Sequence, residues 1–214
     1  MVSGVITTVD PDFLALPLAA LSDAAISTAT RAGASHVDVR IERTRTGYLQ
    51  LRDAHVETQS DDQVLGMGVR VIVDGTWGFA SSPTLSVDTA EALAHQAVAM
   101  ARTSRPLSTE AVALAPEPVY GNRTWVSAYE IDPFSVSDAD KVARLADLSS
   151  RLLAAQAVSH AGATCMFVKE QKHYADSAGT STTQQRVRMQ TQIEAISVGG
   201  HGDASIRNQA QHPG

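Results

Sequence analysis

Seven histidines are the side chains most able to hold a metal ion in this chain, so their spacing is the first test for metal chemistry. Catalytic zinc sites need two or three ligands that converge on one ion, commonly two histidines one helical turn apart with a glutamate beside them. No two histidines stand three to five residues apart; they are His36, His55, His95, His160, His173, His201 and His212. The sequence therefore predicts neither a metal site nor another cofactor within this chain.

The candidate nucleophiles lack the setting that would activate them. Cys165, the single cysteine, lies in an apolar run, where a thiol more often packs in a core than attacks a substrate. Ser127 and Ser177 lack the glycine-flanked elbow of hydrolase nucleophiles. Gly66 and Gly68 lie inside an expected strand and do not open a helix, so they do not form a phosphate-binding loop. We expect no catalytic residue here.

Two short segments could bind a ligand. Gly66 and Gly68 share one face of a strand with Arg70, and two glycines strip that face of side chains, so something should approach the backbone there. A packed helix or a neighbouring strand is the structural explanation, and a bound extended peptide is the functional one. The second segment, 176–180, has the small and polar residues of a tight turn. The candidate peptide-binding residues are Gly66, Gly68, Arg70, Ser177, Gly179 and Thr180.

The elements that carry these residues follow one pattern that occurs twice. In the first copy we expect a helix at 16–32, a hairpin of strands 37–43 and 48–52 that turns at Thr46-Gly47, and a long strand at 64–73. In the second we expect a helix at 138–156, paired strands at 161–169 and 173–177, and a long strand at 182–198. The pairs His36/His160 and Tyr48/Tyr174 keep nearly the same offset, which either a duplication or coincidence explains. The expected fold is α/β of the α+β type, with duplicated units of a helix and an antiparallel or mixed sheet.

Other local signals mark turns, caps and connections. Asp74-Gly75 suits a type I′ turn, Ser86 should cap a helix that runs to about residue 102, and Ser137 should cap the second-copy helix. Asp61 and Asp62 have turn-like surroundings and should be solvated. The segment 103–136 is long for a connection, and its aromatic residues favour anchoring on the surface. We therefore expect an N-terminal arm at 1–15 and a domain at 16–198, in which subunits 16–102 and 137–198 are joined by the anchored connection 103–136. The tail 199–214 should be disordered or outside the family pattern discussed below.

Charge and composition exclude some partners. The chain has 214 residues and a formal net charge of −6, so no basic stripe exists to bind a nucleic-acid backbone. The N-terminus lacks the features of a signal peptide, and no stretch approaches the roughly 20 apolar residues that cross a bilayer. We expect a cytoplasmic protein without membrane or nucleic-acid partners.

Three segments, in this order, resemble the N-terminal region of TldD/PmbA-family proteins. They are GMGVRVI at 66–72 followed by DGTWGFA at 74–80, WVSAYEIDPF at 125–134, and YADSAGT at 174–180 with Gln184 and Arg188. The resemblance runs from about residue 16 to residue 198, and the order of the segments makes it more specific than any one of them.

The resemblance implies a cytoplasmic zinc metallopeptidase system, historically labelled a modulator of DNA gyrase, in which TldD-like and PmbA-like subunits associate and act on peptides or unfolded segments. In this family the N-terminal region is an α/β domain that shapes the substrate cleft, and the metal motif His-Glu-x-x-x-His lies in the C-terminal half. The chain leaves the family pattern near Gly199, before any such motif, so no family ligand can be carried onto a residue here.

The resulting expectation is an N-terminal region, truncated before the metal motif, that handles peptide substrate and assembles with a TldD/PmbA-type subunit as a homo- or hetero-oligomer. Alone it should be inactive, because nothing in it polarises a carbonyl or activates water. The alternative is a stand-alone interaction module, or a degenerate fragment, that pairs with a TldD/PmbA paralogue. Direct binding to DNA or gyrase is suggested by the historical label, and the acidic balance weighs against it.

Overall fold

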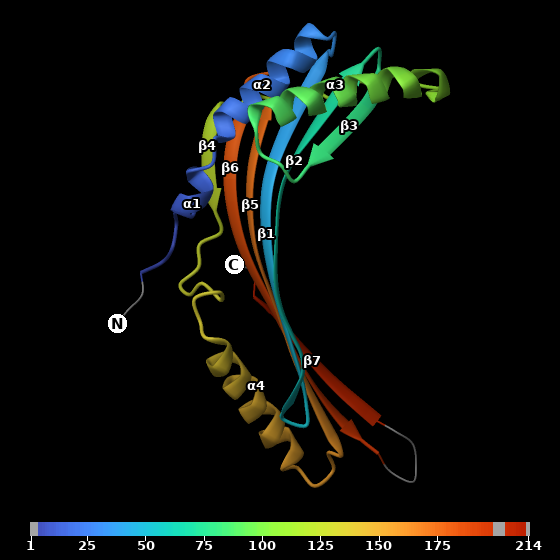
Figure 1. Ribbon diagram of the computed structural model, residues 1–214. Helices are drawn as coiled ribbons and strands as arrows, with labels where there is room; N and C mark the ends of the chain where they lie inside the picture. Colours follow the sequence, from blue (N-terminus) through green and yellow to red (C-terminus); the bar gives the residue numbers. More distant parts are fainter. Residues whose placement is uncertain (1–3, 199–203, 213–214) are drawn as a thin grey trace.

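The computed structural model describes residues 4–198 and 204–212, the latter by their backbone alone. Its described strands form one sheet in the order β3-β2-β1-β5-β6-β4, and β7 also pairs with β6 (Figure 1). The strands are β1 His36–Arg52, β2 His55–Val73, β3 Thr76–Ser82, β4 Asn122–Val126, β5 His160–Asp176, β6 Ser181–Ser197 and β7 Ala204–His212. The helices are α1 Pro11–Leu14, α2 Leu18–Arg31, α3 Val87–Ser104 and α4 Asp138–Leu153, with a short 3₁₀ turn η1 at Arg105–Leu107.

The centre of the sheet is an antiparallel pair of unbroken strands, β1 and β5, each 17 residues long. The expected hairpins at 37–43/48–52 and 161–169/173–177 are therefore wrong. Gly47 does not turn the chain: the Phe167 ring lies on its backbone, and a Cβ at Gly47 would come within 2.0 Å of that ring. The glycine permits a close cross-strand approach and stays in the strand.

Strand β2 is also longer than expected. It begins at His55, after a tight turn in which Asp53 and Ala54 have positive φ, and so contains Asp61 and Asp62. Asp61 is held by both Arg45 Nε and Nη2, at 2.8 and 2.6 Å, on the neighbouring strand. Both residues are exposed as expected, but the expected turn is wrong, because a cross-strand ion pair stabilises the extended chain. The turn predicted at Asp74-Gly75 is confirmed, with φ of 49° and 72°.

All four helices pack on one face of the sheet. Helices α2 and α3 cover one end of the long strands and α4 covers the other (Figure 1). The first core joins both helices to alternate residues of β1 and β2, including Val39, Ile41 and Val69. The second joins Leu145 of α4 to Leu49 and Leu51 of β1. Because strand side chains alternate, the other half of each long strand faces away from every helix described.

The helix starts agree with their sequence signals. Ser86 Oγ accepts from Thr89 N at the start of α3, and Ser137 Oγ accepts from Asp140 N at the start of α4. The alanine-rich face of α3 lies directly on β3, since a Cβ at Gly78 would come within 1.9 Å of the Ala97 carbonyl oxygen.

The two copies of the sequence pattern share one strand register. His36 pairs with Ile72 between β1 and β2, and His160 pairs with Ile196 between β5 and β6. The histidine pair therefore occupies equivalent positions, whereas Tyr48 and Tyr174 fall out of step. The β1–β2 pairing is therefore repeated in the β5–β6 pairing.

The connection 103–136 lies on the sheet and contains a strand that the sequence analysis missed. β4 pairs with β6 in parallel, and Ser127 Oγ next to it accepts from Val187 N at 2.9 Å. Tyr129 is buried and bridges to Ile6 in the N-terminal arm. This pairing at the edge of β6, rather than a periodic apolar pattern, orders the segment.

Residues 204–212 form strand β7 on the outer edge of β6, from Ala204 opposite Ser197 to His212 opposite Met189. The expectation of a disordered tail is wrong for these residues, because backbone hydrogen bonds to a free strand edge need no apolar periodicity. The remainder of the tail, 199–203 and 213–214, lies outside the described residues.

By length and composition alone, the segment Pro11–Arg31 could span a membrane. The sequence analysis overlooked this segment. In the fold it is two helices, with Pro17 between them. Leu21, Ala25 and Ala29 of α2 are fully buried against the sheet, as in a core helix.

Candidate functional site

The candidate site is the face of the sheet that the helices leave uncovered, which we call the open face. On β1 it carries the even-numbered residues from Asp38 to Arg52, all of which are polar. A strand of this length spans about 55 Å. The open face is therefore a long polar surface with two hollows and one buried charge cluster.

The charge cluster surrounds Asp38 at the α2 end of the open face. Asp38 is 1% exposed and lies 2.7 Å from Arg70 Nε, 3.3 Å from Arg40 Nη2 and 3.4 Å from His36 Nε2. Arg70 also stacks on the Trp77 ring at 4.4 Å. A buried carboxylate must be paired, and Arg70, a predicted binding residue, is committed to that pairing.

Tyr174 lies beside this cluster on β5. Burial, followed by the nearby Asp38 and Asp176 carboxylates, raises the pKa of Tyr174 to about 12. The neutral phenol donates to Asp176 Oδ2 at 3.2 Å. It therefore acts as a hydrogen-bond donor at neutral pH.

The turn 177–180 closes the β5–β6 hairpin next to Asp176. The Asp176 Oδ1 atom accepts from Ala178 N and Thr180 N, both at 2.9 Å, and Gly179 has a φ of +101°. Ser177 Oγ accepts from Val37 N, and Thr180 Oγ1 accepts from Tyr120 N. The predicted residues Ser177, Gly179 and Thr180 thus hold the turn and tie it to its neighbours.

Gly66 and Gly68 line the first hollow, a groove of about 530 Å³ between β1, β2 and β3. A Cβ at Gly68 would meet the Phe79 ring at 3.1 Å, so the neighbouring strand supplies the close approach expected there. Phe79 is nevertheless 49% exposed and Val64 is 70% exposed, both at the groove. Arg40 and Glu42 form its polar wall. The groove combines bare backbone, two solvent-exposed apolar side chains and charge.

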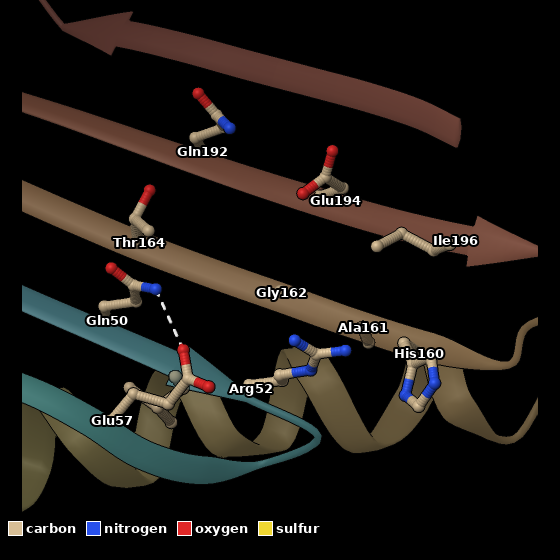
Figure 2. A pocket seen from close by; sticks show the side chains of 11 residues that line it. Gln50, Arg52, Glu57, His160, Ala161, Gly162, Thr164, Gln192, Glu194 and Ile196 are labelled. Atoms are coloured by element: carbon tan, nitrogen blue, oxygen red, sulfur yellow. Dashed lines mark hydrogen bonds between the residues drawn. The ribbon is translucent and has the colours of Figure 1, made fainter.

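The second hollow lies at the α4 end of the open face and has a volume of about 130 Å³. Figure 2 shows Gln50, Glu57, Thr164, Gln192 and Glu194 converging on it from four strands, with helix α4 behind the sheet. Gly162 provides a bare floor, and Gln50 Nε2 donates to Glu57 Oε2 at 2.9 Å. Sequence reasoning missed this hollow, because its residues are polar positions on strands far apart in the chain.

Among residues 4–198 no three His, Cys, Asp or Glu side chains are grouped so as to hold a metal ion, so this part of the chain does not fit a zinc site. Cys165 lies on the helix-covered face, and burial raises the pKa of its thiol. Of the predicted binding residues, Gly66 and Gly68 line the groove. Arg70 and the residues of the 177–180 turn instead make contacts that hold the fold together.

Comparison with known proteins gives a family match and several structural matches. Residues 37–101 match the model of PmbA/TldA metallopeptidase domain 1. A proposed modulator of DNA gyrase from Bacteroides thetaiotaomicron has a TM-score of 0.67 at 16% identity over 88% of this chain, and one from Thermotoga maritima has 0.66 at 14% over 90%. TldE from Thermococcus kodakarensis has 0.66 at 14% over 91%. A sequence search of curated proteins finds no match.

The fold and its open face define a mixed α/β domain of the type found in these solved structures. Within that fold, residues 37–101 match the first domain of the PmbA/TldA metallopeptidase model, which supports the resemblance to the TldD/PmbA family seen in the sequence. The chain spans 43% of the length of each of the three solved structures.

Proposed function

We propose that this chain is the substrate-handling and assembly region of a TldD-like zinc metallopeptidase, and that it captures extended peptide segments at the groove of Gly66 and Gly68. The family match and the shared fold support the link to the peptidase system. Zinc and the hydrolytic step belong to the C-terminal half of such proteins, so the role of this chain is to bind and orient.

One observation carries the proposal: β3 ends at Ser82, opposite Met67, while β2 continues back to His55. Within the described residues, the outer edge of β2 from 55 to 65 is therefore unpaired, and the groove lies at its inner end. An extended peptide can continue the line of β3 by pairing its backbone with this edge.

The groove then supplies the side-chain contacts. A peptide side chain at the end of the added strand would pack on Phe79 and Val64, both exposed, over the bare backbone of Gly66. Backbone pairing tolerates many sequences, and an apolar contact of this kind selects unfolded segments, which expose apolar residues. Arg40 and Glu42 flank the contact, and each already pairs on the sheet, with Asp38 and Lys172 respectively.

The test is fluorescence anisotropy with a labelled, unstructured peptide, using Phe79→Ala and a matched control, Leu107→Ala. Leu107 is 86% exposed and lies outside the groove. We expect Phe79→Ala to weaken binding about tenfold, the typical loss for an apolar anchor, and Leu107→Ala to leave it unchanged. An equal loss in both variants, or none in either, contradicts capture at the groove.

A second measurement tests whether peptide cleavage requires a second subunit. Zinc content and peptide cleavage are measured for the chain alone and for its mixture with a full-length TldD/PmbA-type subunit. We expect cleavage in the mixture and none by the chain alone. Zinc binding and cleavage by the chain alone would overturn the proposal, and association without any peptide binding would favour the interaction module.

A further inference from the structure

A separate cavity lies on the helix-covered face, between α4, the connection 129–136 and strands β5 and β6. We call it the α4 cavity. Its volume is about 370 Å³, within the range of pockets that hold small organic ligands. Ile131, Val136, Phe167, Val187 and Met189 contribute apolar walls. None of the predicted peptide-binding residues borders it.

The mouth of the α4 cavity leaves apolar groups in solvent. Ile131 is 64% exposed and Met189 is 40% exposed, whereas Val187 at the base is buried. Filling a hollow that has a buried base and exposed apolar sides with an apolar group is favourable, because it removes apolar surface from water.

Two basic side chains lie at the rim of the cavity, and one of them has no ion-pair partner among the described residues. Lys141 and Arg144 of α4 both border the cavity. Lys141 Nζ lies 3.0 Å from Asp138 and 4.4 Å from the centre of the Phe167 ring, so it is held over the apolar wall. Arg144 is exposed and makes no hydrogen bond or ion pair with the residues that the structure describes. The one carboxylate of the rim, Asp140, accepts from Ser137 Oγ at 2.6 Å.

We infer that the α4 cavity binds an apolar carboxylate, with its apolar group among Phe167, Val187 and Met189 and its carboxylate on the Arg144 guanidinium. Arginine presents paired donors that match a carboxylate, and Lys141 adds a second positive charge one turn away. Two sources share this chemistry, a fatty acid and the C-terminal residue of an apolar-ended peptide. The inference is independent of the proposed function, because it concerns the opposite face of the sheet.

The test is isothermal titration calorimetry with dodecanoate, below its micelle concentration, and with dodecanol, on the full chain. A second pair of probes is a short glycine-serine peptide ending in two leucines, with a free C-terminus or a C-terminal amide. We expect each carboxylate probe that binds to bind at least about tenfold more tightly than its neutral counterpart. Binding of dodecanoate alone identifies a fatty acid as the source, and binding of the acid peptide alone identifies a chain terminus.

Two arginine variants on the same helix locate the site. Arg144→Gln should weaken carboxylate binding about tenfold, while Arg151→Gln, 74% exposed and outside the cavity, should not change it. Ile131→Ser should weaken the acid and the neutral probes alike, since it removes apolar wall. The inference is overturned if neither carboxylate binds, if the neutral probes bind as tightly, or if the two arginine variants behave alike.

Discussion

At the residue scale, the Asp38 cluster illustrates how polar side chains of the open face specify local structure. Arg70, Arg40 and His36 lie on two strands and converge on one carboxylate that has almost no contact with solvent. Arg70 reads from sequence as a binding residue, because a lone arginine beside two glycines gives no sign of a buried partner on another strand. Its partner comes from the register of β1 against β2, where Asp38 lies opposite Arg70.

Replacing this carboxylate should destabilise the fold. Asp38→Asn removes a charge that pairs with Arg70 and Arg40, and we expect it to lower the free energy of unfolding by about 2 kcal/mol. The guanidinium groups are partly exposed, which limits the loss. Urea denaturation followed by circular dichroism measures it, with the exposed Asp62→Asn as the control. A loss no larger than that of the control would mean that the cluster contributes nothing to stability.

At the element scale, the unbroken length of β1 and β5 decides the shape of the molecule. Thr46-Gly47, between the strands of the first expected hairpin, suggests a turn, yet Gly47 lies under Phe167 in a continuous ladder. Strand β2 pairs with β1 and extends beyond β3, so that within the described residues part of its outer edge is free, and the long strands bring the two hollows onto one surface. The position of both candidate binding regions therefore depends on these strands staying continuous.

Alanine at two strand glycines tests this continuity. A Cβ at Gly47 would overlap the Phe167 ring, so we expect Gly47→Ala to lower the free energy of unfolding by about 2 kcal/mol or more. A Cβ at Gly162, on the paired strand β5, would meet its nearest neighbour at 3.7 Å, an ordinary contact. Gly162→Ala should be neutral or slightly stabilising. Equal unfolding midpoints for the two variants would contradict the packing of Phe167 on β1.

The sequence predicts much of the fold at the level of elements. Helices α2, α3 and α4, the serine caps of α3 and α4, and the turn at Asp74-Gly75 follow from apolar periodicity and local chemistry, which are properties of neighbouring residues. Strands β4 and β7 could not be predicted in this way. Each is stabilised by the backbone of β6, distant in the chain, and neither has an alternating apolar pattern.

The candidate site is predictable only in part for the same reason. Gly66 and Gly68 identify the groove because missing side chains are visible in a sequence, but its apolar contact, Phe79, comes from the next strand. The polar hollow around Gly162 and the α4 cavity each combine residues from several distant elements. Their existence depends on strand register and on helix packing, which local patterns do not specify.

At the scale of the whole molecule, the two faces of the sheet differ in what they carry: one is covered by the helices and the other is open. The covered face holds both apolar cores, and between them it is polar: Gln171 and Gln185 are fully buried there and hydrogen-bonded to each other at 2.7 Å. Around this centre, Lys169 pairs with Asp10 and Asp132, Arg43 with Asp12, and Arg45 with Asp61. The Lys169 and Arg43 pairs attach the connection and the N-terminal arm to the sheet, whereas the Arg45 pair joins β1 to β2.

The ion pairs across the covered face give the whole molecule a predictable response to acid. Hydrogen bonds from Arg43 and Arg45, respectively, hold the pKa of Asp12 and Asp61 below the ordinary value of 3.8. A carboxyl whose folded pKa is lowered stabilises the fold above its unfolded pKa, and that contribution is lost as the pH falls through the folded value. The contribution of these two pairs should therefore be level near neutral pH and decline from about pH 4 downward. Both carboxylates are largely exposed, so each contribution is modest and weakens with salt.

The double variant Asp12→Asn/Asp61→Asn should show a smaller fall in its urea midpoint between about pH 6 and about pH 3 than the unmodified chain, because two of the titrating pairs are gone. The control variant, Asp62→Asn/Glu110→Gln, has the same change of charge but alters exposed carboxylates away from these arginines. Its urea midpoint should fall between the two pH values as much as that of the unmodified chain. Raising the salt concentration should reduce the difference between the two variants, since it screens the arginine pairs. Identical falls in the urea midpoint for both variants at low salt would show that acid destabilises the molecule through other groups.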